Sequence, residues 1–169
     1  MNMDRSETLA GELGRALLAR GWRAATAESC TGGLVAGAIT SIAGSSDWFE
    51  RGFVTYSNEA KQEMLGVPQA LIEAHGAVSE AVVRAMAEGA LAMSAAHCAV
   101  SVTGVAGPGG GTAAKPVGMV CFGWAAVRVA PVVATRHFSG DRTAVRAAAV
   151  EAALAGLIDL VEGQSHPTK

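Results

Sequence analysis

The sequence is short of the residues and charges on which several classes of protein depend. Phe, Trp and Tyr together make up 5% of the 169 residues, too few for a platform on which nucleic-acid bases stack. Lys and Arg nearly balance Asp and Glu, and the formal net charge of −2 offers no basic surface for DNA or RNA. We therefore expect no nucleic-acid partner.

Long hydrophobic runs are absent as well. No apolar run reaches the roughly eighteen residues that a membrane-spanning helix needs. The N-terminal stretch MNMDRSETLAGELG lacks the apolar core of a signal peptide. These two absences predict a cytoplasmic protein with no membrane partner.

Cysteine and histidine are scarce and dispersed. An odd number of cysteines in a reducing compartment predicts no disulfide. The cysteines and histidines also lack the close spacing of a metal site, so we expect neither metal nor cofactor. The residues are Cys30, Cys98, Cys121, His75, His97, His137 and His166.

What the chain does contain is an alternation of helical and strand patterns over a length that fits one core. Helices are predicted over 5–20, 34–42, 58–65, 68–74, 80–95 and 141–161. Strands are predicted over 22–27, 52–56, 98–103, 117–128 and 131–138, the last two as a hairpin around Ala130 and Pro131.

This order predicts an α/β protein with a single three-layer α/β/α domain over residues 1–162 and a mixed β-sheet. Residues 163–169 are predicted to form a disordered tail. The Ala-rich helices over 80–95 and 142–157 allow close helix packing, which makes us expect a homo-oligomer.

Three polar segments come directly after apolar strands: residues 28–33, 56–61 and 103–112. Ligands of open α/β sheets bind outside the carboxyl ends of the strands. If the three strands are parallel, these polar segments gather at one edge. The sequence therefore predicts a binding site there.

The first segment, ESCTGG (28–33), forms a turn from strand to helix. Free main-chain N–H groups at such a turn can hold a phosphate or stabilise an oxyanion. A hydroxyl or thiol beside them, from Ser29 or Cys30, can serve as a nucleophile. The alternative is an ordinary Ser/Thr helix cap with glycines for tight packing.

Lys61 stands in the first turn of a helix that Ser57 caps, where the helix dipole disfavours a cation. A partly desolvated lysine in such a place has a lowered pKa, as a general base requires. Tyr56, the only tyrosine, ends the preceding strand and can relay a proton or bind substrate. The alternatives are an exposed lysine and an edge-strand aromatic.

Arg142 and Arg146 lie four residues apart in the first turns of the last helix, where cations are again disfavoured. A bound anion would resolve the conflict, and the arginine fork suits phosphate. The alternative is a solvated basic face. The glycine-rich residues 107–112 resemble a phosphate-binding loop but lack the Walker lysine, so their alternative is a flexible surface turn.

Taken together, these segments resemble the CinA C-terminal-domain family, whose members include nicotinamide-mononucleotide deamidases. The matching stretches are AESCTGGLVAGAITSIAGSSDWFERGFVTYSNEAKQEMLGV (27–67), HGAVSEAVV (75–83), VTGVAGPGGGTAAKPVG (102–118) and GDRTAVR (140–146). They cover nearly the whole chain in the same order, which makes the resemblance far more specific than any single motif.

The resemblance implies a three-layer fold and an amidase that needs no metal or cofactor. Its substrate would be nicotinamide mononucleotide, converted to nicotinic acid mononucleotide and ammonia in pyridine-nucleotide salvage. Ser29 is implied as the nucleophile and Lys61 as its base, with Tyr56 alongside. The substrate-binding residues so implied are Thr31, Gly32, Gly33, Thr103, Gly107, Gly109, Arg142 and Arg146.

Cys30 is the alternative nucleophile, because thiols are intrinsically stronger nucleophiles than hydroxyls. A cysteine nucleophile usually has a histidine partner, and none lies in these motifs, so we favour Ser29. The chain departs from the family at His97, where an acidic residue is common. We expect the single-domain form of the family, without the further N-terminal domain that some members carry.

Two other functions are compatible with the same residues. A metal-dependent phosphohydrolase needs several carboxylates, and the polar segments offer only Glu28, Asp47 and Asp141, so it ranks low. A non-enzymatic partner-binding module linked to competence or DNA damage is the alternative that we retain. It predicts an exposed apolar patch and no ligand at the strand ends.

Overall fold

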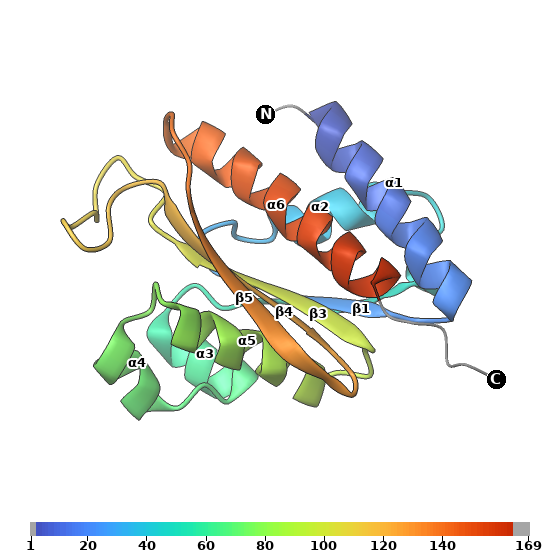
Figure 1. Cartoon of the computed structure of the whole chain (residues 1–169), viewed down its shortest axis with the longest axis horizontal. Coiled ribbons are helices and arrows are strands. Elements are labelled where there is room, and N and C mark those ends of the chain that lie inside the picture. The colour runs from blue at the N-terminus through green and yellow to red at the C-terminus, as the bar shows by residue number, and fades with distance from the viewer. Residues whose placement is uncertain (1–2, 164–169) are drawn as a thin grey trace.

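Residues 3–163 are described by a computed structural model, in which a five-stranded sheet lies between two layers of helices (Figure 1). The helices are α1 (Met3–Arg20), α2 (Leu34–Thr40), α3 (Asn58–Leu65), α4 (Gln69–His75), α5 (Glu80–Ala92) and α6 (Arg142–Glu162). The strands are β1 (Ala24–Glu28), β2 (Phe49–Val54), β3 (Cys98–Gly104), β4 (Met119–Ala126) and β5 (Val129–His137). The predicted tail over 163–169 lies outside the described residues except for Gly163.

The sheet is mixed, in the order β2-β1-β3-β4-β5. β1 pairs in parallel with both β2 and β3, whereas β4 pairs antiparallel with β3 and β5. Every residue of β1 is buried, as expected for a parallel strand covered by helices on both faces. The predicted α/β/α architecture with a mixed sheet is therefore confirmed.

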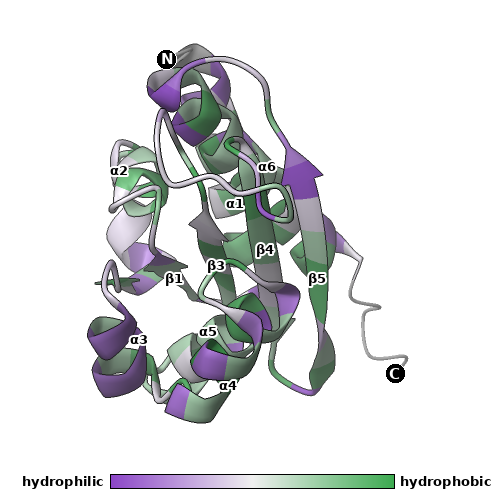
Figure 2. Ribbon diagram, turned by 90° about the vertical axis from the view of Figure 1, so that its left-hand side faces the viewer, coloured by the Kyte–Doolittle hydropathy of each residue, from purple (hydrophilic) through white to green (hydrophobic). Residues whose placement is uncertain are grey.

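Two apolar cores hold the layers together. α1, α2 and α6 cover one face of the sheet and α3, α4 and α5 cover the other (Figure 1). Leu13 and Leu17, from the apolar stripe of α1, are fully buried in the first core, as helical periodicity predicts. In Figure 2 the central strands are largely green, whereas α3 and α4 carry hydrophilic purple segments.

The small residues of the long helices have a role within the chain itself. A Cβ at Gly156 of α6 would collide with the Trp124 ring, and one at Gly89 of α5 would collide with the Leu65 carbonyl. Close helix packing therefore occurs inside the domain. The expected homo-oligomer stays a prediction.

Several predicted boundaries differ from the observed ones, and two of the differences change the description of the sheet. The hairpin turns at Val127 and Arg128, not at Ala130 and Pro131, and Arg128 adopts a positive φ of 64°. Pro131 instead lies in β5 at the edge of the sheet, where a missing N–H is tolerated. The second strand, predicted over 52–56, ends at Val54, so Tyr56 follows the strand.

The carboxyl ends of β1, β2 and β3 meet at one edge of the sheet because the three strands are parallel. The Ser29 N–H donates to the Val102 carbonyl (2.9 Å), and the Thr55 N–H donates to the Glu28 carbonyl (2.8 Å), which extends the pairing beyond β1 and β2. The predicted gathering of the polar segments at this edge is confirmed.

No helix among the described residues is long and apolar enough to cross a membrane.

Candidate active site

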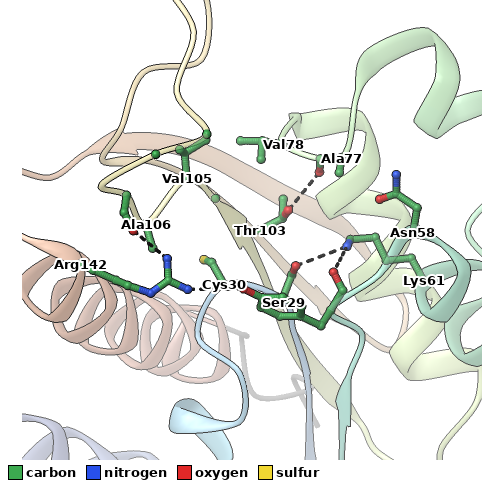
Figure 3. Close-up of a pocket in the computed structure, with 15 residues that line it drawn as sticks. Ser29, Cys30, Asn58, Lys61, Ala77, Val78, Thr103, Val105, Ala106 and Arg142 are labelled. Carbon is green, nitrogen blue, oxygen red and sulfur yellow. Dashed lines mark hydrogen bonds between the residues drawn. The ribbon is translucent and has the colours of Figure 1, made fainter.

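A cavity of about 320 Å³ opens at this edge of the sheet. Figure 3 shows Lys61 entering it from α3, with Ser29 and Cys30 between Lys61 and Arg142, which comes from α6. Of the predicted site residues, the cavity is lined by Ser29, Tyr56, Lys61, Thr103, Gly107, Gly109 and Arg142. Seven of the eleven predicted site residues therefore lie together in the wall of one cavity, and the other four lie outside that wall.

Ser29 and Lys61 form the central pair of polar side chains. Lys61 Nζ lies 3.3 Å from Ser29 Oγ, and both side chains are buried. The Lys61 amine also donates to the main-chain carbonyls of Thr55 (3.1 Å) and Tyr56 (3.4 Å). The segment after β2 therefore aims Lys61 at the residue that follows β1.

The position of Lys61 follows from how α3 begins. Ser57 caps the helix, and its hydroxyl accepts from the Ala60 N–H at 3.0 Å, so Lys61 lies at the start of α3 as predicted. The side chain turns inward and is 1% exposed. Burial lowers the pKa of the Lys61 ammonium, and the nearby Cys30 and Glu59 oppose this shift only in part. A lysine that loses its proton readily is suited to act as a base.

Tyr56 and Thr103 line the same cavity but differ in exposure. Tyr56 is 64% exposed, and its hydroxyl lies 3.4 Å from Nη2 of Arg142. Because Lys61 contacts Ser29 directly, proton transfer between them needs no relay through Tyr56. Thr103 is buried, and its hydroxyl donates to the Ala77 carbonyl at 3.0 Å.

The start of α2 is not available to a ligand, because Glu28 occupies it. The buried Glu28 carboxylate accepts from the N–H groups of Val35 (2.8 Å) and Ala36 (3.1 Å). This bonding satisfies the orphan donors of the helix and places a negative charge where the dipole favours it. The capping role of Glu28 was not predicted from the sequence.

Thr31, Gly32 and Gly33 accordingly do not line the cavity. Gly32 donates its N–H to the Ser29 carbonyl at 3.0 Å. Gly33 takes a positive φ of 102° at the helix cap, a conformation that favours glycine. The glycines thus shape the turn that presents Ser29. The main-chain N–H groups of residues 31–33 were expected to bind an anion of the substrate, but these residues lie outside the cavity wall.

Arg142 and Arg146 lie on the same helix but have different partners. Arg142 lines the cavity and donates from Nη1 to the Gly107 carbonyl at 2.7 Å. Arg146 lies outside the cavity wall and donates to the carbonyls of Cys30 (3.1 Å) and Thr31 (3.3 Å). Arg146 therefore holds the Ser29 turn, and Arg142 alone of the two faces the cavity.

Cys30 also lines the cavity, but its thiol is poorly suited to attack. It is 7% exposed, and burial raises the pKa of the thiol to about 11. A thiol with that pKa is almost wholly protonated at neutral pH, and the thiolate is the reactive form. No histidine lines this cavity.

Apart from Cys30, the alternative nucleophile, seven lining residues were not among the predicted site residues: Asn58, Ala77, Val78, Gly104, Val105, Ala106 and Gly110. Asn58 lies in the polar segment 56–61, which the sequence indicates as part of the site, so its amide could have been predicted as a binding group. The other six are small or apolar residues, which give no chemical signal of their own.

Within residues 3–163, no group of three or more His, Cys, Asp or Glu side chains is arranged to hold a metal ion. Glu28, one of the carboxylates on which a metal-dependent phosphohydrolase would rely, is bonded to α2 instead. The polar groups that remain in the cavity are hydroxyls, an amine, an amide and a guanidinium.

The profile of the CinA C-terminal domain matches residues 6–161. The chain belongs to the CinA C-terminal domain family. It is 58% identical over 146 residues to a nicotinamide-nucleotide amidohydrolase, PncC, of Enterobacter agglomerans, a match that covers 86% of this chain and 89% of the relative. The enzyme of the same name from Escherichia coli K12 is 57% identical, with 86% and 88% covered.

The fold of this CinA-family chain also matches a solved structure. The crystal structure of the competence/damage inducible protein CihA from Agrobacterium tumefaciens superposes with a TM-score of 0.90 at 48% sequence identity. The match covers 92% of this chain and 95% of that one. The resemblance drawn from the sequence motifs is therefore confirmed.

Proposed function

We propose that this protein is an amidase that hydrolyses the carboxamide of nicotinamide mononucleotide, with Ser29 as nucleophile and Lys61 as general base. The observation that carries the proposal is the contact of 3.3 Å between the buried Lys61 amine and the Ser29 hydroxyl. The names of the CinA-family relatives, nicotinamide-nucleotide amidohydrolases, supply the substrate.

The three contacts of Lys61 are to oxygen atoms. They match the three donors of the ammonium, and the same geometry serves the neutral amine that a base requires. Such an amine has two N–H donors and one lone pair, whereas the ammonium has three donors. The carbonyls of Thr55 and Tyr56 accept the two N–H groups, which leaves the lone pair for the hydroxyl proton of Ser29. The lowered pKa of Lys61 favours this state.

In the first step, Ser29 Oγ bonds to the amide carbon while its proton passes to Lys61. The tetrahedral intermediate then collapses, the C–N bond breaks, and Lys61 returns the proton to the departing nitrogen, which leaves as ammonia. In the second step, Lys61 takes a proton from water as the water attacks the acyl-Ser29 ester. The bond between the acyl carbon and Ser29 Oγ then breaks, and Lys61 returns the proton to Ser29 Oγ. The acid product leaves as a carboxylate after its remaining proton passes to solvent.

The developing oxyanion needs donors, and Glu28 fills the start of α2. We assign the oxyanion to the main-chain N–H of Cys30, which directly follows Ser29 in the turn and belongs to a residue that lines the cavity. One such donor is worth about 3 kcal/mol in the transition state. This assignment moves the oxyanion site from residues 31–33 to the turn directly after Ser29.

Arg142 and the glycine-rich loop form the end of the cavity away from Lys61, and we assign the substrate phosphate to them. A guanidinium suits phosphate geometry. Tyr56 beside Arg142 offers its ring to the pyridinium. Remote binding of the phosphate would orient the carboxamide at Ser29 and so serve the transition state.

The test is ammonia release from nicotinamide mononucleotide by the wild type, Ser29→Ala and Cys30→Ala, with a chelator present. We expect turnover by the wild type and Cys30→Ala and none above background by Ser29→Ala. Cys30→Ala is the matched control, because it alters the neighbouring side chain of the same turn.

Loss of turnover in Cys30→Ala with retention in Ser29→Ala would assign the attack to the thiol. Absence of ammonia release by the wild type would remove the amidase assignment. The alternative of a non-enzymatic partner-binding module would then be the one to pursue.

A further inference from the structure

Two chain segments that are distant in sequence form part of the cavity wall. Ala77 and Val78 come from the connection between α4 and α5, and residues 105–107 come from the glycine-rich loop after β3. The wall keeps its shape only if these two connections keep their separation. Neither segment belongs to a helix or strand, so other contacts must fix them.

Lys115 makes such a contact. Lys115 lies in the loop between β3 and β4, on the carboxyl-terminal side of the glycine-rich residues. Its Nζ donates to the main-chain carbonyl of His75, the last residue of α4. Carbonyls at the carboxyl end of a helix are unsatisfied within the helix and carry partial negative charge, which favours a cation there. Lys115 itself does not line the cavity.

The surroundings of Lys115 are built for this contact. The Thr112 N–H donates to the Lys115 carbonyl at 2.9 Å, and the Lys115 N–H donates to Thr112 Oγ1 at 3.0 Å, which fixes the base of the lysine side chain. A Cβ at Gly76 would lie 2.6 Å from Lys115 Nζ. Gly76, at a φ of 78°, thus admits the amine to the carbonyl beside it.

The wall segment is held from its other side as well. Thr103 at the end of β3 donates its hydroxyl to the Ala77 carbonyl at 3.0 Å (Figure 3). The carbonyls of His75 and Ala77 are therefore bonded to two different parts of the chain. Loss of the Lys115 contact removes the one of these two bonds that ties the segment to the glycine-rich loop, while the Ser79 hydroxyl still donates to the Gly76 carbonyl at 2.8 Å.

We propose that Lys115 is a positioning residue that ties the glycine-rich loop to the end of α4 and thereby sets the fit of the substrate in the cavity. This inference rests on the proposed amidase activity. Lys115 acts on binding in the ground state and the transition state alike, because Ser29 and Lys61 lie on other segments. The expected effect is thus on KM rather than on kcat.

The kinetic test uses Lys115→Met, which keeps the length of the side chain and removes the donor. We expect KM for nicotinamide mononucleotide to rise about tenfold, equivalent to about 1.4 kcal/mol, with kcat within twofold of the wild type. Lys115→Arg, which retains a donor for the carbonyl, restores KM to within about threefold. Arg84→Met is the control, because it removes a positive charge from an exposed position of α5, in the same layer of helices as α4. It should leave KM and kcat unchanged.

Nicotinamide riboside separates positioning from simple attraction of the phosphate. If Lys115 positions the wall, Lys115→Met raises KM for the riboside as well, although less than for the mononucleotide, because the glycine-rich loop also meets the phosphate. A rise confined to the mononucleotide, or no rise in KM at all, would overturn the proposal.

Hydrogen exchange without substrate provides a readout that does not depend on turnover. The Gly76 N–H bonds to the Ile72 carbonyl, and the Gly118 N–H bonds to the Val105 carbonyl. Lys115→Met is expected to accelerate exchange at both sites. Unchanged exchange at Gly76 would contradict the proposal that Lys115 ties the glycine-rich loop to the end of α4. A wild type that releases no ammonia would refute the proposed function while this measurement still decides the role of Lys115.

Discussion

At the amino-terminal edge of the sheet the polar groups satisfy one another, whereas at the carboxyl-terminal edge several of them face an open cavity. His97 accepts from the Arg23 N–H at 2.9 Å, and its ring stacks on Trp22 with centroids 6.1 Å apart. Ser29, Lys61 and Thr103 are more deeply buried, yet all three line a cavity. All three are paired within the chain, as buried polar groups usually are. The two edges therefore differ in that the polar groups of the carboxyl-terminal edge lie in the wall of a cavity that can admit a ligand.

The largest effect is expected from Lys61→Met, which removes the amine from the carboxyl-terminal edge. Turnover should fall at least about a thousandfold, because removing one member of a catalytic pair has effects of this size. The measurement is ammonia release, with circular dichroism to confirm folding. Lys61→Arg serves as a second variant, since it keeps a donor for the carbonyls but stays protonated. Activity within tenfold of the wild type in both would exclude Lys61 as the base.

The second effect is the pH dependence of kcat/KM. Only the neutral amine accepts the Ser29 proton, and burial lowers the Lys61 pKa from its ordinary value of 10.5. Activity should therefore rise with pH and level off above an apparent pKa that is lower than 10.5. Below that pKa each pH unit should reduce kcat/KM about tenfold, as the neutral fraction falls. A profile that falls as pH rises through this range would contradict the base role.

The third effect compares Arg142→Ala with Arg146→Ala, two changes of the same kind on one helix. Arg142→Ala should raise KM for the mononucleotide at least about tenfold, because a charged hydrogen bond to phosphate contributes about 1.5–3 kcal/mol. Arg146→Ala should instead lower the free energy of unfolding by about 1–3 kcal/mol, since it leaves two carbonyls of the Ser29 turn unbonded. Steady-state kinetics and urea unfolding measure the two quantities. Unchanged turnover in Arg142→Ala would refute the phosphate assignment.

The fourth effect concerns Glu28, which fixes the turn without touching the cavity. Glu28→Gln replaces a two-oxygen acceptor with a single one and should lower the free energy of unfolding by about 1–3 kcal/mol. A displaced Ser29 should also reduce kcat about tenfold, since small misplacements are costly in catalysis. Glu12→Gln on the exposed face of α1 is the control. Equal behaviour of the two variants would show that the cap does not matter.

The smallest effect on activity is expected at the amino-terminal edge. His97→Ala removes the acceptor of the Arg23 N–H and the stacking partner of Trp22. It should lower the free energy of unfolding by about 1 kcal/mol and leave kcat within twofold. A large loss of kcat with intact folding would mean that the amino-terminal edge also contributes to turnover, which would contradict the difference between the two edges.

Much of the fold could be read from the sequence because apolar periodicity determines which faces are buried. The stripe that contains Leu13 and Leu17 predicted α1, and the parallel arrangement followed from strands separated by helices. The hairpin was misplaced because Pro131 suggests a turn, whereas an edge strand tolerates it and the turn uses Arg128. Register and edge position depend on partners far away in the chain.

The site was predictable to the extent that it follows strand ends. Ser29 comes directly after β1, and Lys61 lies at the start of the helix that follows the neighbouring strand β2, so the topology brings the two reactive groups to the same edge. The Glu28 cap was missed because it depends on a side chain reaching N–H groups seven and eight residues ahead. The different roles of Arg142 and Arg146 depend on which carbonyls lie opposite each guanidinium. The spacing of the two residues along the helix does not determine these partners.

The most direct test of the Ser29 mechanism is to identify the acylated residue. Nicotinamide mononucleotide is mixed with the enzyme and quenched in acid during the first turnovers, and the peptides are mapped by mass spectrometry. The account predicts a nicotinoyl-ribotide ester on Ser29 of the wild type and of Cys30→Ala, absent from Ser29→Ala. An adduct on Cys30 would contradict it.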